Sequence, residues 1–191
     1  GRNNFRKTLV MRQNWQLWHK TLSKERCEEI CKQCYETGHF QQATVFNDGE
    51  YQENSTVRQT KLAWIQDPEL KQFVMDYLLE ANRNAFGLDV NFLPELQFGE
   101  YNEGSFYNWH HDINWENTTF SDRKLSIVIQ LSDPTTYEGG DFEFLEIEQP
   151  KGFKDQGSIL VFPSYNVHRV TEVTKGTRNS IVSWMEGPRW R

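Results

Sequence analysis

The sequence has no long hydrophobic stretch. No apolar run approaches the roughly 20 residues that cross a bilayer, so we expect no membrane-spanning helix. The first ten residues, GRNNFRKTLV, lack the apolar core of a signal peptide, and we interpret residues 1–10 as a leader or a vector-derived extension. Aromatic residues make up 14% of the chain, which is too many for a disordered protein and predicts a packed core.

Positive charge is scarce along much of the chain. Lys and Arg number 21 against 27 Asp and Glu, and the formal net charge is −6. Two stretches, 89–122 and 125–150, contain acidic residues but no Lys or Arg. Proteins that bind nucleic acids usually carry basic stripes. The composition therefore makes a nucleic-acid partner unlikely and favours a metal ion or a cationic substrate.

Cysteines are few and clustered: Cys27, Cys31 and Cys34 are the only three. An odd number without a secretory signal predicts reduced thiols in a cytoplasmic protein, not a disulfide framework. The spacing also matches the cluster-binding triplet of radical S-adenosylmethionine enzymes, but such a triplet requires a loop. Here the cysteines share one face of a helix that we expect to begin after Ser23 and to end at Gly38, so we interpret them as core residues.

The rest of the chain divides into a helical part and a strand-rich part. A second helix is predicted from the capping Asp67 to Gly87, and residues 56–65 between the helices are expected to form a strand. After Leu96 the pattern changes to short β-branched segments separated by turns. We expect strands at 125–131, 141–147, 158–162 and 179–184.

Short strands that follow helices are typical of an antiparallel barrel or jelly roll with the helices on one outer face. We therefore predict an α+β fold, mainly β: a double-stranded β-helix, or jelly roll, with supporting N-terminal helices. Residues 1–191 are expected to form a single domain, in which 15–95 are the helical support region and 96–191 the jelly-roll core. The pattern does not indicate an oligomeric state.

A His-x-Asp triplet occurs at His110 and Asp112. On an extended backbone the two side chains point the same way, with His111 facing the opposite side. His168 follows a later strand, and two His with one carboxylate form the ligand set of non-haem Fe(II) oxygenases. A surface turn for the triplet and a structural role for His168 are the alternatives.

Arg178 lies ten residues after His168 and opens the last predicted strand. In an antiparallel barrel, this spacing returns the chain to a position beside the three ligands. A guanidinium there can bind a carboxylate through two hydrogen bonds, with the Ser180 hydroxyl adding a third. The alternative is a surface arginine paired with an acid.

Residues 56–190 resemble the Fe(II)- and 2-oxoglutarate-dependent dioxygenases, specifically the prolyl-4-hydroxylase-like (PKHD-type) branch. Several ordered segments carry the resemblance: YNEGSFYNWHHD (101–112), LSIVIQLSDP (125–134), YEGG (137–140), GSILVFPS (157–164) and HRVTEVTKGTR (168–178). A chance match of so many segments in the same order is very improbable.

The resemblance implies roles for particular residues. His110, Asp112 and His168 are expected to be the catalytic iron ligands. Arg178 is expected to bind the distal carboxylate of 2-oxoglutarate, with a hydrogen bond from the Tyr101 phenol and help from Ser180. Other members of the wider family use a tyrosine near the end of the 125–131 strand for a further contact. Gln130 is the equivalent here, so the nature of this contact is open.

The resemblance also implies an activity and its cofactors. An Fe(II) enzyme is expected to use 2-oxoglutarate and O2 to hydroxylate a C–H bond, with release of succinate and CO2 and with ascorbate as a stimulating reductant. A prolyl residue of a peptide or protein is the leading substrate, followed by a free amino acid or small metabolite and then by a nucleobase. A non-catalytic cupin-like binding module is the alternative from a different class.

Five residues are candidate substrate contacts. Four aromatic side chains flank the ligand-bearing strand: Tyr107, Trp109, Trp115 and Phe120. We expect them either to line a substrate groove or to pack at the mouth of the barrel. Arg58 is expected to reach the same mouth.

Overall fold

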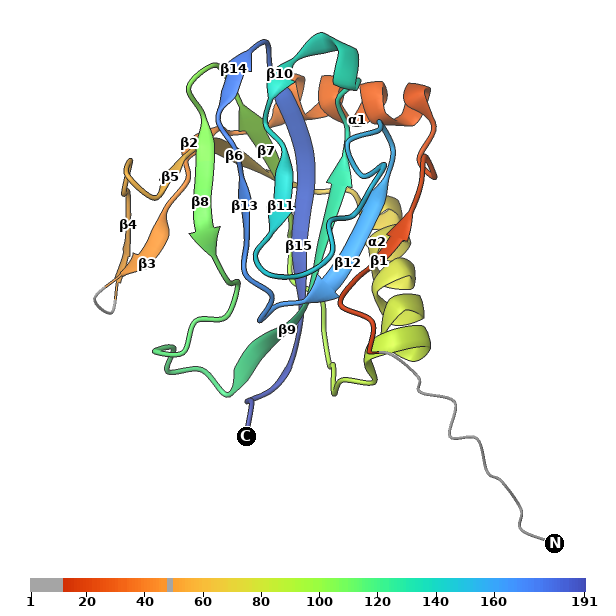
Figure 1. Ribbon diagram of the computed structural model, residues 1–191, viewed down its shortest axis with the longest axis vertical. Coiled ribbons are helices and arrows are strands. Elements are labelled where there is room, and N and C mark those ends of the chain that lie inside the picture. The colour runs from red at the N-terminus through yellow and green to blue at the C-terminus, as the bar shows by residue number, and fades with distance from the viewer. Residues whose placement is uncertain (1–11, 48–49) are drawn as a thin grey trace, which may run out of the picture.

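The computed structural model describes residues 12–47 and 50–191, so the predicted leader at 1–10 lies outside the described residues. Two antiparallel β-sheets face each other, and the helices cover the outer side of the larger sheet (Figure 1). This arrangement confirms the predicted double-stranded β-helix with supporting helices.

Within the described residues the larger sheet has seven strands and the smaller has four. In spatial order the larger sheet contains β1 (Gln16–Trp18), β12 (Ile159–Pro163), β9 (Ser121–Gln130), β15 (Arg178–Pro188), β7 (Leu96–Tyr101), β6 (Lys61–Ile65) and β2 (Gln41–Gln42). The smaller contains β11 (Phe142–Phe144), β13 (His168–Val170), β8 (Phe106–His110) and β5 (Arg58–Gln59). Two short ribbons pair β3 (Val45–Asn47) with β4 (Glu50–Gln52), and β10 (Glu138–Gly139) with β14 (Val173–Lys175).

The helices begin and end near the predicted residues. Helix α1 (Lys24–Thr37) is capped by Ser23, whose hydroxyl accepts a hydrogen bond from the backbone N–H of Arg26 at 3.1 Å. Helix α2 (Pro68–Ala81) continues into a π-helical turn, η1 (Asn82–Phe86), and Gly87 ends it in the left-handed region. None of the described helices is long and apolar enough to span a bilayer.

The cysteines of α1 belong to the core, as predicted. Cys27 and Cys34 are buried, and they pack with α2 and the outer side of the larger sheet. Burial raises the pKa of Cys31 to about 12 and that of Cys27 to about 11. The thiols therefore stay protonated at neutral pH, and their place on the buried face of a regular helix is that of core residues.

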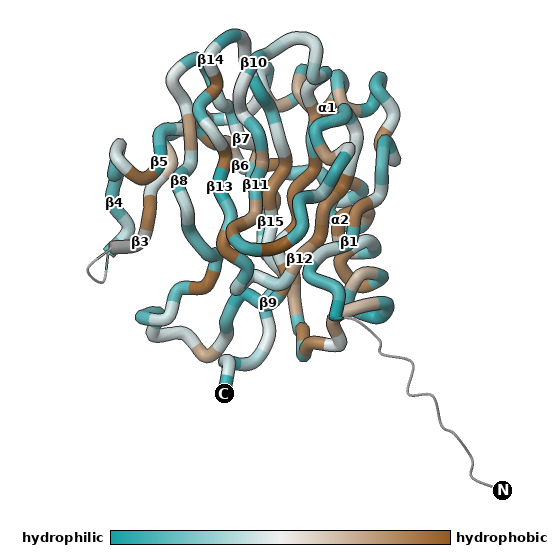
Figure 2. The backbone as a smooth tube through the Cα atoms, viewed as in Figure 1, coloured by the Kyte–Doolittle hydropathy of each residue, from teal (hydrophilic) through white to brown (hydrophobic). Residues whose placement is uncertain are grey.

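The side chains of each central strand alternate between two buried regions, one under the helices and one between the two sheets. On β9, Leu125, Ile127 and Ile129 pack against the helices, whereas Val128 belongs to a second cluster between the sheets. The apolar colour of Figure 2 is accordingly concentrated on the central strands and on α2. Because successive residues of a strand face opposite sides, the residues at 126, 128 and 130 all point between the sheets.

Some predicted elements differ in extent. The strand expected at 56–65 is divided at Thr60, because β5 pairs with β8 in the smaller sheet and β6 pairs with β7 in the larger one. The strand expected at 141–147 ends at Phe144, shortly before Glu146 takes a positive φ of 61°. The region 15–95 contains both helices but also supplies β1, β2 and β6 to the larger sheet, so its support of the barrel is only partly helical.

Neighbouring leucines on α2 give a direct test of this packing. Leu78 is fully buried against the sheet, whereas Leu79 is 41% exposed. We predict that Leu78→Ala lowers the free energy of unfolding by about 2–5 kcal/mol, whereas Leu79→Ala changes it by less than about 0.5 kcal/mol. Urea denaturation measures both values, and equal losses would show that α2 does not pack on the sheet through this face.

Candidate metal centre

Three side chains from two adjacent strands converge between the sheets. His110 ends β8, Asp112 follows it, and His168 begins β13 opposite His110 in the antiparallel register. One ligand atom from each of the three residues lies within 4.8 Å of the other two. Asp112 Oδ1 is 3.4 Å from Nε2 of His110 and 3.6 Å from Nε2 of His168.

Backbone carbonyl groups orient both imidazoles. Nδ1 of His110 lies 2.7 Å from the carbonyl oxygen of Asn108, and Nδ1 of His168 lies 2.9 Å from that of Asn166. A carbonyl oxygen only accepts hydrogen bonds, so each Nδ1 carries the proton. Each Nε2 therefore presents a lone pair toward the carboxylate, which is the arrangement that metal-binding histidines require.

Two serines hold the carboxylate in place. Ser126 donates to Asp112 Oδ2 at 2.5 Å, and Ser164 lies 2.9 Å from Ser126. Burial by itself would raise the pKa of Asp112, but the imidazoles of His168 and His110 and the Ser126 hydroxyl together hold it well below its ordinary value. Burial lowers the pKa of His168 to about 4. At neutral pH the site thus contains an ionised carboxylate and an unprotonated His168.

A β-bulge shapes the wall of this site. Val170 pairs with Tyr107 while His168 pairs with His110, so β8 has one more residue than β13 over this span. The bulge places Tyr107 and His110 on the same side, and their rings stack with centroids 3.5 Å apart. Two imidazole nitrogens and one carboxylate suit non-haem Fe(II), and the donor set leaves positions open for other ligands.

A buried arginine lies beyond the three ligands. Arg178 pairs with Tyr101 in the register of β15 and β7, and its guanidinium lies 5.1 Å from the Tyr101 ring. The Arg178 side chain is 1% exposed, and its Nε and Nη2 have no hydrogen-bond partner among residues 12–47 and 50–191. The same holds for Ser180 Oγ and Gln130 Oε1.

Gly99 leaves space beside these polar groups. A Cβ atom at this position would lie 3.3 Å from Ser180 Oγ and 3.6 Å from the Tyr101 ring. A buried cation, a buried hydroxyl and a phenol around such a space form an environment for an anion. The residues present therefore fit a small carboxylic acid as well as a metal ion.

A cavity of about 880 Å³ is lined by His110 and Asp112, two of the three ligands, together with other residues from both sheets. Four of the five candidate substrate contacts lie on it: Arg58, Tyr107, Trp109 and Trp115. Phe120 is not among its lining residues and is 96% exposed, so the expectation for that side chain was wrong. His111 also lines the cavity, although its ring faces Trp115 instead of the ligands.

The structure adds residues to which the sequence analysis assigned no role. Arg123 and Trp184 line the cavity, and the Arg123 guanidinium lies 3.6 Å from the Trp184 ring centroid. Ser126 supports Asp112, and Tyr137 lies beside Arg178. Side chains an even number of positions apart on a strand face the same side. Ser126 therefore shares the inner face of its strand with Gln130, and Trp184 shares that of its strand with Ser180, so the sequence could have predicted both. Tyr137 lies in a turn, where strand alternation does not apply, and the segment YEGG (137–140) that carries the resemblance was the only signal for it.

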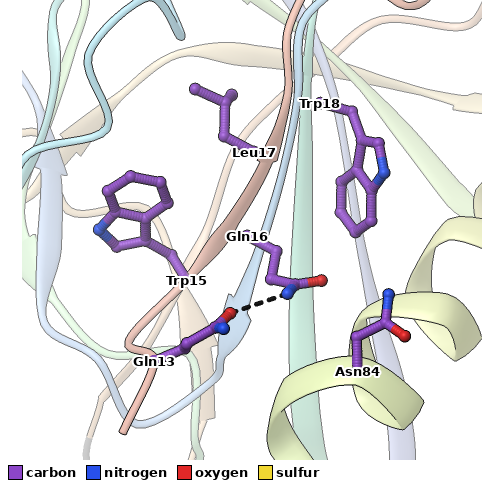
Figure 3. A pocket seen from close by; sticks show the side chains of 6 residues that line it. All are labelled: Gln13, Trp15, Gln16, Leu17, Trp18 and Asn84. Carbon is purple, nitrogen blue, oxygen red and sulfur yellow. Dashed lines mark hydrogen bonds between the residues drawn. The ribbon is translucent and has the colours of Figure 1, made fainter. Parts of the chain in front are cut away.

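Figure 3 shows a second, shallow hollow beside β1. It is lined by Gln13, Trp15, Gln16, Leu17, Trp18 and Asn84. The only hydrogen bond drawn runs from Gln16 Nε2 to Gln13 Oε1, at 2.8 Å. This lining contains no titratable side chain, so it offers neither a metal ligand nor an acid–base group.

The segment that contains His110, Asp112, His168 and Arg178 matches a known protein family. Residues 96–186 match the model of the 2OG-Fe(II) oxygenase superfamily. Over 119 residues the chain is 34% identical to a PKHD-type hydroxylase of Gloeothece citriformis, a match that covers 62% of this chain and 54% of that protein. The chain thus spans about half the length of this curated relative.

Two solved structures share the fold over nearly the whole chain. The viral collagen prolyl hydroxylase of Paramecium Bursaria Chlorella virus-1, in its 2OG complex, has a TM-score of 0.68 at 14% identity and covers 92% of this chain and 97% of its own. A prolyl hydroxylase from Trichoplax adhaerens, in complex with a hypoxia-inducible-factor peptide fragment, has a TM-score of 0.71 at 19% identity and covers 90% and 83%. At these identities the likeness establishes the fold alone.

The support of Asp112 by Ser126 is testable. We predict that Ser126→Ala weakens the binding of Fe(II) or Mn(II) by about 10–100-fold, because the carboxylate loses the bond that orients it. Calorimetric titration of the apo-protein measures the affinity. Ser183→Ala is the matched control, since Ser183 is equally buried but its hydroxyl bonds the backbone oxygen of Glu95. Equal affinities in the two variants would contradict this role.

Proposed function

We propose, from the membership of residues 96–186 in the 2OG-Fe(II) oxygenase superfamily, that the protein is an Fe(II)- and 2-oxoglutarate-dependent hydroxylase. One observation carries the proposal: a cluster of His110, Asp112 and His168 lies in the same barrel as a buried Arg178 that lacks a carboxylate partner in the described chain. A metal and an anionic cosubstrate are the two components that this activity requires.

Each part of the site has a task in this proposal. His110, Asp112 and His168 hold the iron through Nε2 and a carboxylate oxygen. Bound iron, 2-oxoglutarate and O2 supply the oxidising chemistry, which converts the oxoacid to succinate and CO2 and a substrate C–H to C–OH. The ionised Asp112 and the Nδ1–H bonds of both imidazoles keep the three ligands preorganised for the ion.

Arg178 is the anchor for the distal carboxylate of the oxoacid. Its unpartnered Nε and Nη2 can donate two parallel hydrogen bonds to one carboxylate. Tyr101 and Ser180 present hydroxyl groups on the neighbouring strand positions. Because these groups are buried, a charge-assisted bond here is stronger than the same bond in water.

The cavity lining supports a prolyl residue of a peptide as the substrate. Trp109, Trp184 and Tyr107 provide aromatic faces beside His110, on which an apolar five-membered ring packs well. The solved Trichoplax adhaerens enzyme was captured with a peptide fragment. A free amino acid or small metabolite is the second candidate, because the same lining accommodates a smaller molecule.

Two guanidinium groups add polar anchors to the cavity. Arg58 lies 4.4 Å from the centroid of the Tyr107 ring, and both Arg58 and Arg123 act against the burial that raises the pKa of Tyr107 to about 12. Neither arginine pairs with a carboxylate in the part of the chain that the structure describes. They are therefore available to peptide carbonyl oxygens or to a substrate carboxylate.

Anaerobic titration tests the proposed function. We predict that Fe(II) and 2-oxoglutarate together produce the weak visible absorption band of an iron-chelated oxoacid in the native protein. His168→Ala removes one ligand and is expected to abolish the band while the far-ultraviolet dichroism is retained. A folded native protein without any band would instead favour the non-catalytic binding module. Succinate release with prolyl peptides and with free proline, with and without ascorbate, then separates the two substrate classes.

The role of Arg178 predicts opposite effects on binding and on stability. Arg178→Met replaces an unpaired buried cation with an apolar side chain, so we expect an equal or higher free energy of unfolding for the apo-protein. The affinity for 2-oxoglutarate is expected to fall at least about tenfold, with Fe(II) affinity retained. Arg83→Ala on η1 is the control. A large loss of stability in Arg178→Met would show that the arginine is a structural residue.

A further inference from the structure

A second phenol lies at the Arg178 end of the barrel. Tyr137 is 4% exposed, and its hydroxyl oxygen accepts a hydrogen bond of 2.6 Å from Gln130 Nε2. The charge of Arg178 acts on this phenol directly, and it opposes the rise in the pKa of Tyr137 that burial causes. Tyr137 and Arg178 therefore lie close together, although they come from a turn and from β15.

The backbone around Tyr137 is built to bring the two side chains together. Tyr137 follows the 3₁₀ turn η2 (Pro134–Thr136), which Asp133 caps by accepting a bond from the Thr135 N–H. Gly140 adopts a φ of +60°. A Cβ atom there would lie 3.1 Å from Arg178 Cδ and 3.3 Å from the Tyr137 ring, so a side chain at this position would push the two residues apart.

The hydrogen bonds around the phenol leave one donor unused. The Tyr137 oxygen accepts from Gln130, so the phenol proton must point away from that amide. None of the described residues accepts a hydrogen bond from this proton. Burial raises the pKa of Tyr137, so the phenol is neutral at physiological pH and remains a donor. A buried donor of this kind is costly unless an acceptor occupies the pocket.

We propose that Tyr137 donates this hydrogen bond to the distal carboxylate of the oxoacid, beside the bonds from Arg178, and that Gln130 is the positioning residue that fixes its direction. This inference rests on the proposed function. Gln130 then acts through Tyr137, in place of a direct contact with the oxoacid.

The geometry makes Tyr137 a determinant of which acid binds. A neutral phenol and a guanidinium on one carboxylate provide donors from two directions, and such donors favour an oxoacid that carries a second carboxylate at the right reach. An acid that chelates the metal but has no distal carboxylate makes neither contact. The contribution of Tyr137 is therefore specific to one end of the ligand.

Two probes separate this role from simple packing. Fe(II)-loaded protein is titrated under anaerobic conditions with 2-oxoglutarate and with oxalate, which keeps two metal-chelating oxygens and lacks a distal carboxylate. Tyr137→Phe is expected to raise the dissociation constant of 2-oxoglutarate about tenfold or more and to leave that of oxalate unchanged. Tyr77→Phe on α2 is the matched control, and thermal unfolding checks that each variant is folded.

A double-mutant cycle tests the role of Gln130. Gln130→Leu is expected to weaken 2-oxoglutarate binding in the native background and to have no further effect in the Tyr137→Phe background. Equal losses in both backgrounds would show that Gln130 contacts the oxoacid directly and would overturn the positioning role.

The failures of the two proposals are distinguishable. If the native protein binds 2-oxoglutarate and Tyr137→Phe binds it equally well, the inference about Tyr137 is wrong and the proposed function stands. Parallel losses of 2-oxoglutarate and oxalate affinity would assign Tyr137 a structural role and overturn the inference as well. If the native protein binds oxalate through Fe(II) but not 2-oxoglutarate, the cosubstrate assignment itself fails.

Discussion

The positive charge of Arg178, buried at one end of the barrel, is the constraint on which the arrangement of the surrounding polar groups depends. The Arg178 guanidinium is 1% exposed, and no described side chain supplies a carboxylate to it. A buried charge is costly unless an anion compensates it. Tyr101 and Tyr137, which both lie near this guanidinium, carry hydroxyl groups and no negative charge, so the site fits an anionic ligand. The stability that this arrangement costs is consistent with a site kept for binding.

The opposite faces of the same strands explain how the fold tolerates such an interior. On β9 and β15, the residues that pack against the helices are apolar, among them Ile127, Ile129 and Ile181. The alternate residues, such as Ser126 and Gln130, face the site. Apolar burial under α1 and α2 therefore stabilises the larger sheet from one side. Between the sheets, the polar groups of the site lie beside a second apolar cluster that includes Val128, Leu160 and Phe162.

The sequence was most informative where period-2 geometry decides the outcome and least informative at turns and bulges. His110 and Asp112 were brought together by their spacing, and Arg178 by its place at the start of a strand. The β-bulge that places Tyr107 beside His110 could not be predicted from the alternation of polar and apolar residues along the strand. Tyr137 lies in a turn whose path depends on Gly140 and on packing against distant residues, so no local pattern announces its position. The roles of all these residues remain proposals.

Net charge proved a poor guide to the local field. The formal charge of −6 and the acid-rich stretches favoured a metal ion or a cationic substrate. The cluster of His110, Asp112 and His168 fits a metal ion, whereas the cavity beside it contains Arg58 and Arg123, and Arg178 is buried in the same barrel. Many of the acids instead pair with surface bases, as Asp141 does with Lys154 and Glu143 with Arg169. Screening weakens exposed charges over about 10 Å, whereas a buried guanidinium acts at short range in a low dielectric. The few charges inside the barrel, not the sum over the chain, therefore set the electrostatic field at the site.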